Sequence, residues 1–164
     1  MRRRLLLLPL LAGSLAACGF RLRGAPRFPF DSLHLAATSP LAQELRRNLE
    51  SSGQLRVLDA RSSPTQAQVV LELLAEQRQK VVAGRSAAGQ VREFQLRMSL
   101  RFRLRTSRGV ELIPETTLAQ QRDISFNESQ ALAKEAEEEL LLRDMQSDLV
   151  QQLMRRLAAV TLPG

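Results

Sequence analysis

The side chains that most often carry chemistry are scarce in this chain of 164 residues, which has one cysteine, Cys18, and one histidine, His34. A lone cysteine forms neither an intramolecular disulfide nor a thiolate metal cluster. His34 has no cysteine or paired carboxylates at a recognisable spacing, and the sequence has no glycine-rich phosphate loop and no nucleophile elbow. Glu137–Glu139 are adjacent in a helical pattern and point in different directions. We therefore predict no catalytic residue, no metal ion and no cofactor, and a protein that acts by binding or scaffolding rather than as an enzyme.

The chemistry open to Cys18 depends on the segment before it. Arg2–Arg4 precede an apolar run, Leu5–Leu15, which is broken only by a proline, a glycine and a serine and is followed by small residues. A positive end, a short apolar middle and a small cleavage site are typical of a secretory signal. The run covers 11 residues, whereas a helix needs about 20 to cross the hydrocarbon of a bilayer. We expect a cleaved signal over residues 1–17 rather than a permanent span or a buried first helix.

The cleavage region, Leu15–Gly19, resembles the lipobox of bacterial lipoproteins, with Cys18 in the position of the modified cysteine. This resemblance implies that the thiol receives a diacylglyceryl group, that the signal is cut before Cys18, and that the new amino terminus is acylated, with palmitate an expected acid. Each buried methylene contributes about 0.8 kcal/mol, so two or three acyl chains give a stable anchor. Gly19 stands where many inner-membrane lipoproteins have aspartate, which implies an outer-membrane anchor that faces the periplasm.

The charge that remains after cleavage is modest. The formal net charge would fall from +7 to +4, because Arg2–Arg4 are the only charged residues before Cys18. Such an excess suits a phosphate-bearing partner, but the six phenylalanines are scattered and the basic residues form no clustered runs. Binding to nucleic acid is therefore not expected. Residues 18–29, which contain Pro26 and Pro29, are expected to form an extended lipidated tether, and residues 30–164 a single domain.

Apolar periodicity predicts a sheet and two helices in residues 30–164. Ser39 and Pro40 are a helix start, and Gly53 is its end. A second helix is expected from Asn127, with Gln130 as a capping-box partner, to about Val160. The strand candidates are residues 30–37, 55–58, 67–82, 91–106 and 110–124, the last interrupted by Pro114.

This order of elements predicts an α+β fold. Two helices with one apolar stripe each can cover one face of a sheet, which gives a two-layer sandwich. The sheet is expected to be roughly four-stranded, mixed and largely antiparallel, because the long strands follow one another in a meander. His34 is expected to face solvent or to lie at an edge.

The other sheet face would then be bare and strongly charged. It is expected to carry four arginines on one strand and four charged residues on its neighbour: Arg97, Arg101, Arg103 and Arg105, and Glu72, Glu76, Arg78 and Lys80. Two interpretations are open. The charges keep a solvated face soluble, or the face docks a partner, since guanidinium groups pair bidentately with carboxylates and phosphates.

Three segments, Cys18–Gly24, Asn127–Glu138 and Gln151–Leu157, resemble the LPS-assembly lipoprotein LptE family. The resemblance extends over essentially the whole chain after the signal, in both motif spacing and element order. It implies a two-helix, four-stranded sandwich that forms a complex with the outer-membrane β-barrel LptD, plugs it and assists its assembly. It also implies binding of lipopolysaccharide during transport to the cell surface.

The same resemblance implies which residues contact lipopolysaccharide. A basic residue in the loop between the long strands maps to Arg85, with Arg92 as a competitor, and a lysine near the start of the last helix maps to Lys134. For Lys134 the alternative is a pair within the helix with Glu137 or Glu138. For the whole protein the alternative is a free periplasm-facing lipoprotein that binds an anionic lipid or glycan for another envelope transport system.

Replacement of Cys18 by alanine tests the lipobox. We expect the Cys18→Ala chain to incorporate no labelled fatty acid and to keep its first 17 residues, because the thiol is the acceptor of the diacylglyceryl group. Metabolic labelling and mass spectrometry of the membrane fraction measure both properties. A conservative Ser14→Ala chain is the control and should be labelled normally; normal labelling of Cys18→Ala would refute the assignment.

Overall fold

The computed structural model describes residues 27–53 and 55–163, so Cys18, the predicted signal and most of the predicted tether lie outside the described residues. Within these ranges the chain forms two α-helices, five strands and two short 3₁₀ turns. The helices are α2 (Pro40–Ser51) and α3 (Ala131–Ala158). The strands are β1 (Ser32–His34), β2 (Arg56–Leu58), β3 (Val69–Arg85), β4 (Val91–Thr106) and β5 (Glu111–Ser125). Neither helix of the described ranges is long and apolar enough to cross a membrane.

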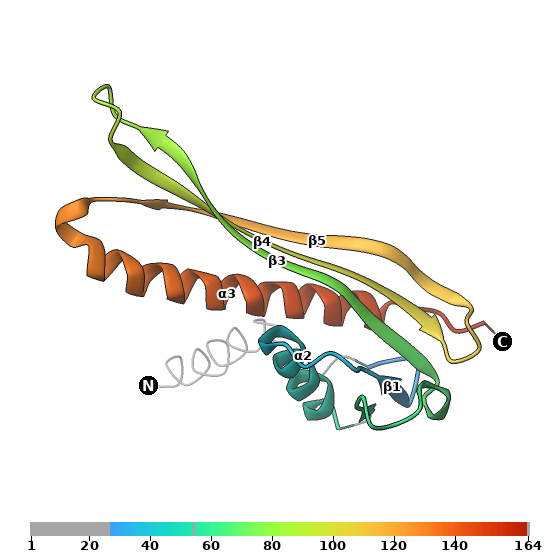
Figure 1. Ribbon diagram of the computed structural model, residues 1–164. Coiled ribbons are helices and arrows are strands. Elements are labelled where there is room, and N and C mark those ends of the chain that lie inside the picture. The colour runs from blue at the N-terminus through green and yellow to red at the C-terminus, as the bar shows by residue number, and fades with distance from the viewer. Residues whose placement is uncertain (1–26, 54, 164) are drawn as a thin grey trace, which may run out of the picture.

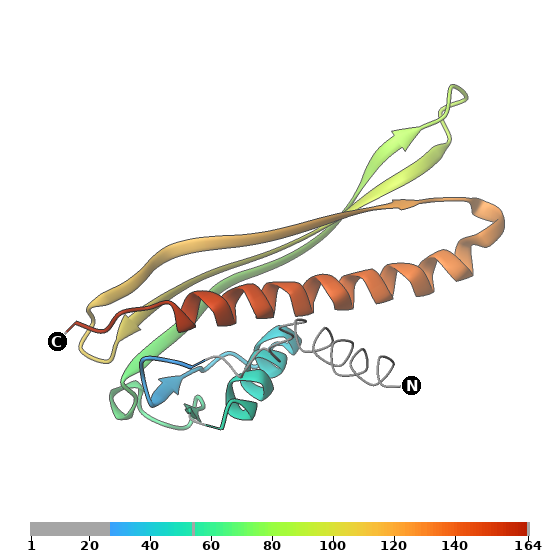
Figure 2. The same cartoon turned by 180° about the vertical axis from the view of Figure 1, so that it is seen from behind.

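The strands form one mixed sheet in the order β2-β1-β3-β4-β5. β1 is parallel to both of its neighbours, while β3, β4 and β5 form an antiparallel meander. Helix α3 runs beside the long strands for most of their length, and α2 lies near one end (Figures 1 and 2). The predicted α+β sandwich is confirmed, with five strands in place of roughly four.

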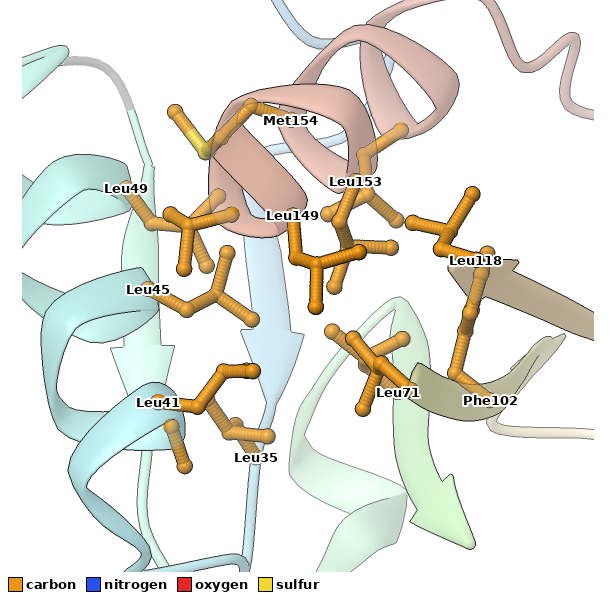
Figure 3. Packing of buried hydrophobic residues seen from close by; sticks show 14 of the residues in the cluster. Leu35, Leu41, Leu45, Leu49, Leu71, Phe102, Leu118, Leu149, Leu153 and Met154 are labelled. Carbon is orange, nitrogen blue, oxygen red and sulfur yellow. The ribbon is translucent and has the colours of Figure 1, made fainter. Parts of the chain in front are cut away.

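The core lies between the helices and one face of β4. On this strand the predicted alternation is confirmed, since alternate side chains from Leu96 to Leu104 are buried. Leu41, Leu45 and Leu49 of α2 are buried as predicted and point toward Leu149 of α3 (Figure 3). The core therefore joins both helices to the sheet in one apolar cluster.

Local signals set the ends of the elements. Ser39 caps α2, since its hydroxyl accepts a hydrogen bond from the amide of Ala42 at 3.1 Å, and Pro40 is the first helical residue. Gly53 follows the helix with a φ of +71°, a conformation that favours glycine. Pro114 lies on the edge strand β5 where the pairing with β4 shifts in register, as predicted.

Strand β3 contains a bulge that the sequence analysis did not predict. Leu73 pairs with Phe102 of β4, whereas Ala75 pairs with the adjacent residue, Arg101. Leu74 is therefore an extra residue without a partner, and the side chains that follow it change faces.

The bulge corrects the predicted composition of the bare face. Glu76, Arg78 and Lys80 pair with Leu100, Met98 and Leu96, whose side chains are buried under the helices. These three charged residues therefore lie on the helix-covered face, and only Glu72 remains on the bare face as predicted. Arg78 donates to Gln146 of α3 at 2.6 Å, which ties the strand to the helix.

His34 is buried, contrary to the prediction that it faces solvent or lies at an edge. Its exposed fraction is 5%, because β1 lies between β2 and β3 and all three of its residues are buried. The Nε2 atom donates to the carbonyl oxygen of Ser62 at 3.1 Å, which links β1 to the loop after β2. The histidine is thus a structural residue of a central strand.

The start of α3 also differs from the prediction. Asn127 caps a 3₁₀ turn, Glu128–Gln130, by accepting a hydrogen bond from the amide of Ser129 at 3.1 Å, and α3 begins only at Ala131. Gln130 makes no side-chain capping bond, so the predicted capping box is wrong. The predicted apolar stripe is buried from Met145 to Leu157, but Leu132 is 82% exposed, because the first turns of α3 extend past the core.

Candidate functional site

Two regions carry the residues that the sequence analysis selected. One is the end of the molecule where α3 begins and the β3–β4 hairpin projects (Figure 1). The other is the sheet face opposite the helices, called the open face below, which carries Arg97, Arg101, Arg103 and Arg105. The residues of the first region come from separate elements, whereas the four arginines of the open face all lie on β4.

A small pocket, called the distal pocket below, lies between the start of α3 and the ends of β4 and β5. Its volume is about 140 Å³. It is lined by two lysines, two phenylalanines and further residues of β5 and α3: Lys80, Phe94, Ile124, Ser125, Phe126, Ala131, Lys134, Glu135 and Glu138. Cations and aromatic surface thus meet at one place.

Lys80 enters the distal pocket because of the bulge in β3. Its Nζ atom lies 4.4 Å from the centroid of the Phe94 ring and 2.5 Å from a carboxylate oxygen of Glu138. Phe94 in turn packs edge-to-face with Phe126, with ring centroids 5.2 Å apart. A cation over an aromatic face and an ion pair with α3 hold the lysine between strand and helix.

Lys134 is bonded within the fold. Its Nζ atom donates to Ser125 Oγ at 3.0 Å and to a carboxylate oxygen of Glu137 at 2.8 Å. The side chain is 18% exposed. The pair with Glu137 is one of the two alternatives predicted for this lysine, while Glu138 pairs with Lys80 instead. An incoming phosphate would therefore have to displace the Glu137 carboxylate from Lys134, because this lysine is not an isolated cation.

Arg85 and Arg92 lie on the β3–β4 hairpin, as expected for the loop between the long strands. Arg85 Nη1 donates to the carbonyl oxygen of Gly89 at 3.1 Å, and Arg92 Nη2 donates to Gln90 Oε1 at 3.2 Å. Among residues 27–53 and 55–163, neither guanidinium has a carboxylate within 4.0 Å. Both are available to a phosphate, but no hydrogen bond between described residues joins either of them to Lys134.

The four arginines of the open face differ in their partners. Arg103 and Arg105 both bind Glu72, with Arg105 Nη2 at 3.0 Å from Glu72 Oε1. Arg101 Nη1 lies 3.2 Å from Glu115 Oε1. Arg97 Nε donates to Gln95 Oε1 at 2.7 Å, and it has no carboxylate partner in the part of the chain that the structure describes.

These contacts shift the pKa values of Glu72 and Arg103. The hydrogen bond from Arg103, supported by that from Arg105, lowers the pKa of the Glu72 carboxyl, although partial burial opposes this effect. This hydrogen bond, which Arg103 donates to Glu72, also raises the pKa of the Arg103 guanidinium above its ordinary value. One carboxylate thus serves two arginines, and the cluster retains net positive charge on the open face.

The sequence analysis missed Lys80 and Phe94 as members of a site. It placed Lys80 on the open face because it assumed unbroken alternation along β3. The available signal was the consecutive apolar run Leu73-Leu74-Ala75, which interrupts that alternation. Within the described ranges, no group of three or more histidine, cysteine, aspartate or glutamate side chains is placed to hold a metal ion.

Comparison with known proteins gives a family match for most of the chain. The family described as "LptE: Lipopolysaccharide-assembly" matches residues 30–157. The chain belongs to the LptE family. The LPS-assembly lipoprotein LptE of Photorhabdus laumondii is 31% identical to this LptE-family chain over 172 residues, which cover 98% of this chain and 88% of that protein.

Solved structures share the fold of this LptE-family chain. The solution structure of lipoprotein B from Nitrosomonas europaea has a TM-score of 0.72 at 31% identity and covers 86% of this chain and 91% of that chain. The crystal structure of rare lipoprotein B from Shewanella oneidensis has a TM-score of 0.65 at 21% identity, with 78% and 94% covered. At that lower identity the likeness shows the fold alone.

The lowered pKa of Glu72 leads to a prediction about how the free energy of unfolding depends on pH. Because folding lowers this pKa below 4.5, the carboxylate stabilises the fold above pH 4.5, and this contribution is lost as the pH falls through the lower, folded value. We expect Glu72→Gln to lower the free energy of unfolding at neutral pH by the small amount typical of an exposed ion pair. The difference from wild type should shrink as the pH falls below 4.5 and through the lower, folded pKa of Glu72.

Denaturant unfolding of both chains between neutral and acid pH measures this difference. Glu50→Gln is the control, since Glu50 is exposed on α2 and forms no ion pair with a described residue. A Glu72→Gln effect that is independent of pH would contradict the electrostatic explanation.

Proposed function

We propose that this LptE-family protein acts in lipopolysaccharide transport as a non-enzymatic, lipid-anchored partner of the outer-membrane β-barrel LptD. In this proposal it forms a complex with the barrel, plugs it and assists its assembly. Membership of the family is the observation that carries the proposal. The name of the Photorhabdus relative, an LPS-assembly lipoprotein, supports the same cargo and the same kind of membrane attachment.

The anchor and the domain layout belong to this proposal. Lipid on Cys18 would hold the protein at the periplasmic side of the outer membrane after removal of residues 1–17. Residues 18–29 would act as the tether and residues 30–164 as the functional domain. The match of the family to residues 30–157 agrees with this division of the chain.

The open face supports docking to the barrel. Both helices pack against one sheet face, and no other helix or strand of residues 27–53 and 55–163 covers the opposite face. The Arg103–Glu72–Arg105 cluster and the Arg101–Glu115 pair place three guanidinium groups on this face. We propose Arg97, Arg101, Arg103 and Arg105 as partner-docking residues, since guanidinium groups bind carboxylates of a partner bidentately.

The distal end supports contact with lipopolysaccharide. Arg85 and Arg92 on the hairpin offer guanidinium groups without carboxylate partners among the described residues, and the distal pocket places Lys134 beside aromatic side chains. The lipid A part of lipopolysaccharide carries phosphates next to acyl chains. A cationic end with apolar surface matches that chemistry, so we propose Arg85, Arg92 and Lys134 as lipopolysaccharide-binding residues.

Co-purification in mild detergent tests the complex. We expect the tagged protein to retain a partner with the mass of LptD, and we expect Arg101→Glu with Arg103→Glu to reduce that partner at least several-fold, because reversed charges would repel carboxylates. Arg47→Glu with Arg143→Glu is the control, with the same charge change on exposed helix residues. Recovery of the wild-type protein alone would refute the plug and favour a free periplasm-facing lipoprotein.

Lipopolysaccharide binding is tested separately. We expect Arg85→Glu with Lys134→Glu to weaken binding of purified lipopolysaccharide about 10-fold or more, since two cations become anions. Helicity and melting temperature should change little, because the lost Lys134–Glu137 pair contributes about 0.3–0.5 kcal/mol. Arg47→Glu with Arg156→Glu, on exposed helix residues, is the control with the same change of net charge. Binding that is unchanged in the Arg85→Glu, Lys134→Glu variant would discard these contacts.

A further inference from the structure

A hollow in the open face has no residue in common with the distal pocket and shares only Arg97 with the proposed docking residues. Its volume is about 340 Å³, and it lies across β3, β4 and β5. Two rows of paired residues form it: Gln77, Ser99 and Ala119 in one, and Gln79, Arg97 and Gln121 in the next. Because serine and alanine are small, the middle of the first row is low and the longer side chains surround it.

The chemistry of this lining is unusual for a charged sheet face. Glutamine amides and one serine hydroxyl supply both donors and acceptors, and the methylene stems of the glutamines supply apolar surface. No carboxylate and no aromatic ring lines the hollow. Neutral hydrogen-bonding groups beside C–H surface complement a ligand that has hydroxyl groups on a C–H framework, as a sugar does.

Arg97 adds selectivity for charge. Arg101, Arg103 and Arg105 each have a carboxylate within 4.0 Å, so their charge is at least partly matched inside the fold. Arg97 binds only the neutral amide oxygen of Gln95, and among the described side chains it has no carboxylate partner. Its guanidinium can therefore form a bidentate pair with an acidic group of a ligand in the hollow.

We propose that this hollow binds an acidic saccharide, with Arg97 on the carboxylate or phosphate and the glutamines on the hydroxyl groups. The inference rests on the proposed function, because it takes the ligand to be the sugar region of the lipopolysaccharide that the protein helps to transport. The hollow lies on the opposite face of the sheet from the distal pocket. One glycolipid would thus be contacted at its sugar region and at its lipid region by separate surfaces.

The test uses the mature lipidated chain in detergent and a lipid-free acidic oligosaccharide released from lipopolysaccharide by mild acid hydrolysis. Calorimetric titration should detect binding of this oligosaccharide and none of a neutral maltooligosaccharide of similar length. Arg97→Gln removes the cation and Ala119→Tyr fills the hollow, so each should weaken binding about 10-fold or more. Arg108→Gln, in the exposed turn between β4 and β5, is the control with the same loss of charge and should bind as wild type does.

Absence of binding by the wild-type chain would overturn the inference, as would equal binding of the acidic and neutral sugars. Undiminished binding by both Arg97→Gln and Ala119→Tyr would also overturn it.

Each variant is also tested for barrel co-purification. Ala119→Tyr decides this comparison, because Arg97 is itself a proposed docking residue whereas Ala119 is not. Retained barrel with lost sugar binding by Ala119→Tyr supports the inference, whereas loss of the barrel together with the sugar would mean that the hollow is a barrel contact. If the wild-type chain keeps its barrel but binds no sugar, the inference alone fails; absence of the barrel from wild type refutes the proposed function instead.

Discussion

The two faces of β4 carry different chemistry, and the rest of the molecule depends on that separation. Side chains from Leu96 to Leu104 bury one face against the helices, while the residues between them keep the other face polar. Burial of each large apolar side chain contributes about 1.5–3 kcal/mol, so the row on β4 sets the register of the whole meander. A slip of one residue would bury guanidinium groups, which is strongly unfavourable without partners.

Helix α3 makes both apolar and polar contacts on the helix-covered face. Its apolar residues from Met145 onward complete the core, and its polar residues bind charged side chains of the adjacent strands. Arg122 of β5 pairs with Asp148 at 3.1 Å, and Lys80 of β3 pairs with Glu138. The helix is therefore fixed by apolar burial along its C-terminal half and by ion pairs with the adjacent strands, which positions Lys134 at its start.

Strong periodicity made most of the fold predictable from sequence. The long strands, the capped helix that begins at Pro40 and the proline at the edge of the sheet follow from local rules of pattern and capping. The burial of His34 was not predictable, because it depends on two parallel partners that are distant in sequence. The faces of Glu76, Arg78 and Lys80 were also missed, since one bulged residue inverts the strand from Ala75 to Val82. The arginines of β4 lie on the predicted face, because the alternation along that strand is unbroken.

The core does not extend to the end of the molecule where α3 begins. Leu132 and Leu140 are largely exposed there, and the β3–β4 hairpin projects away from β5 and α3 (Figure 2). Segments with few buried apolar contacts open at a lower free energy than the core to which they are joined. This end can thus fray and close again while α2, β1 and the middle of the sheet stay intact, so a bulky amphiphile could enter between strand and helix without global unfolding.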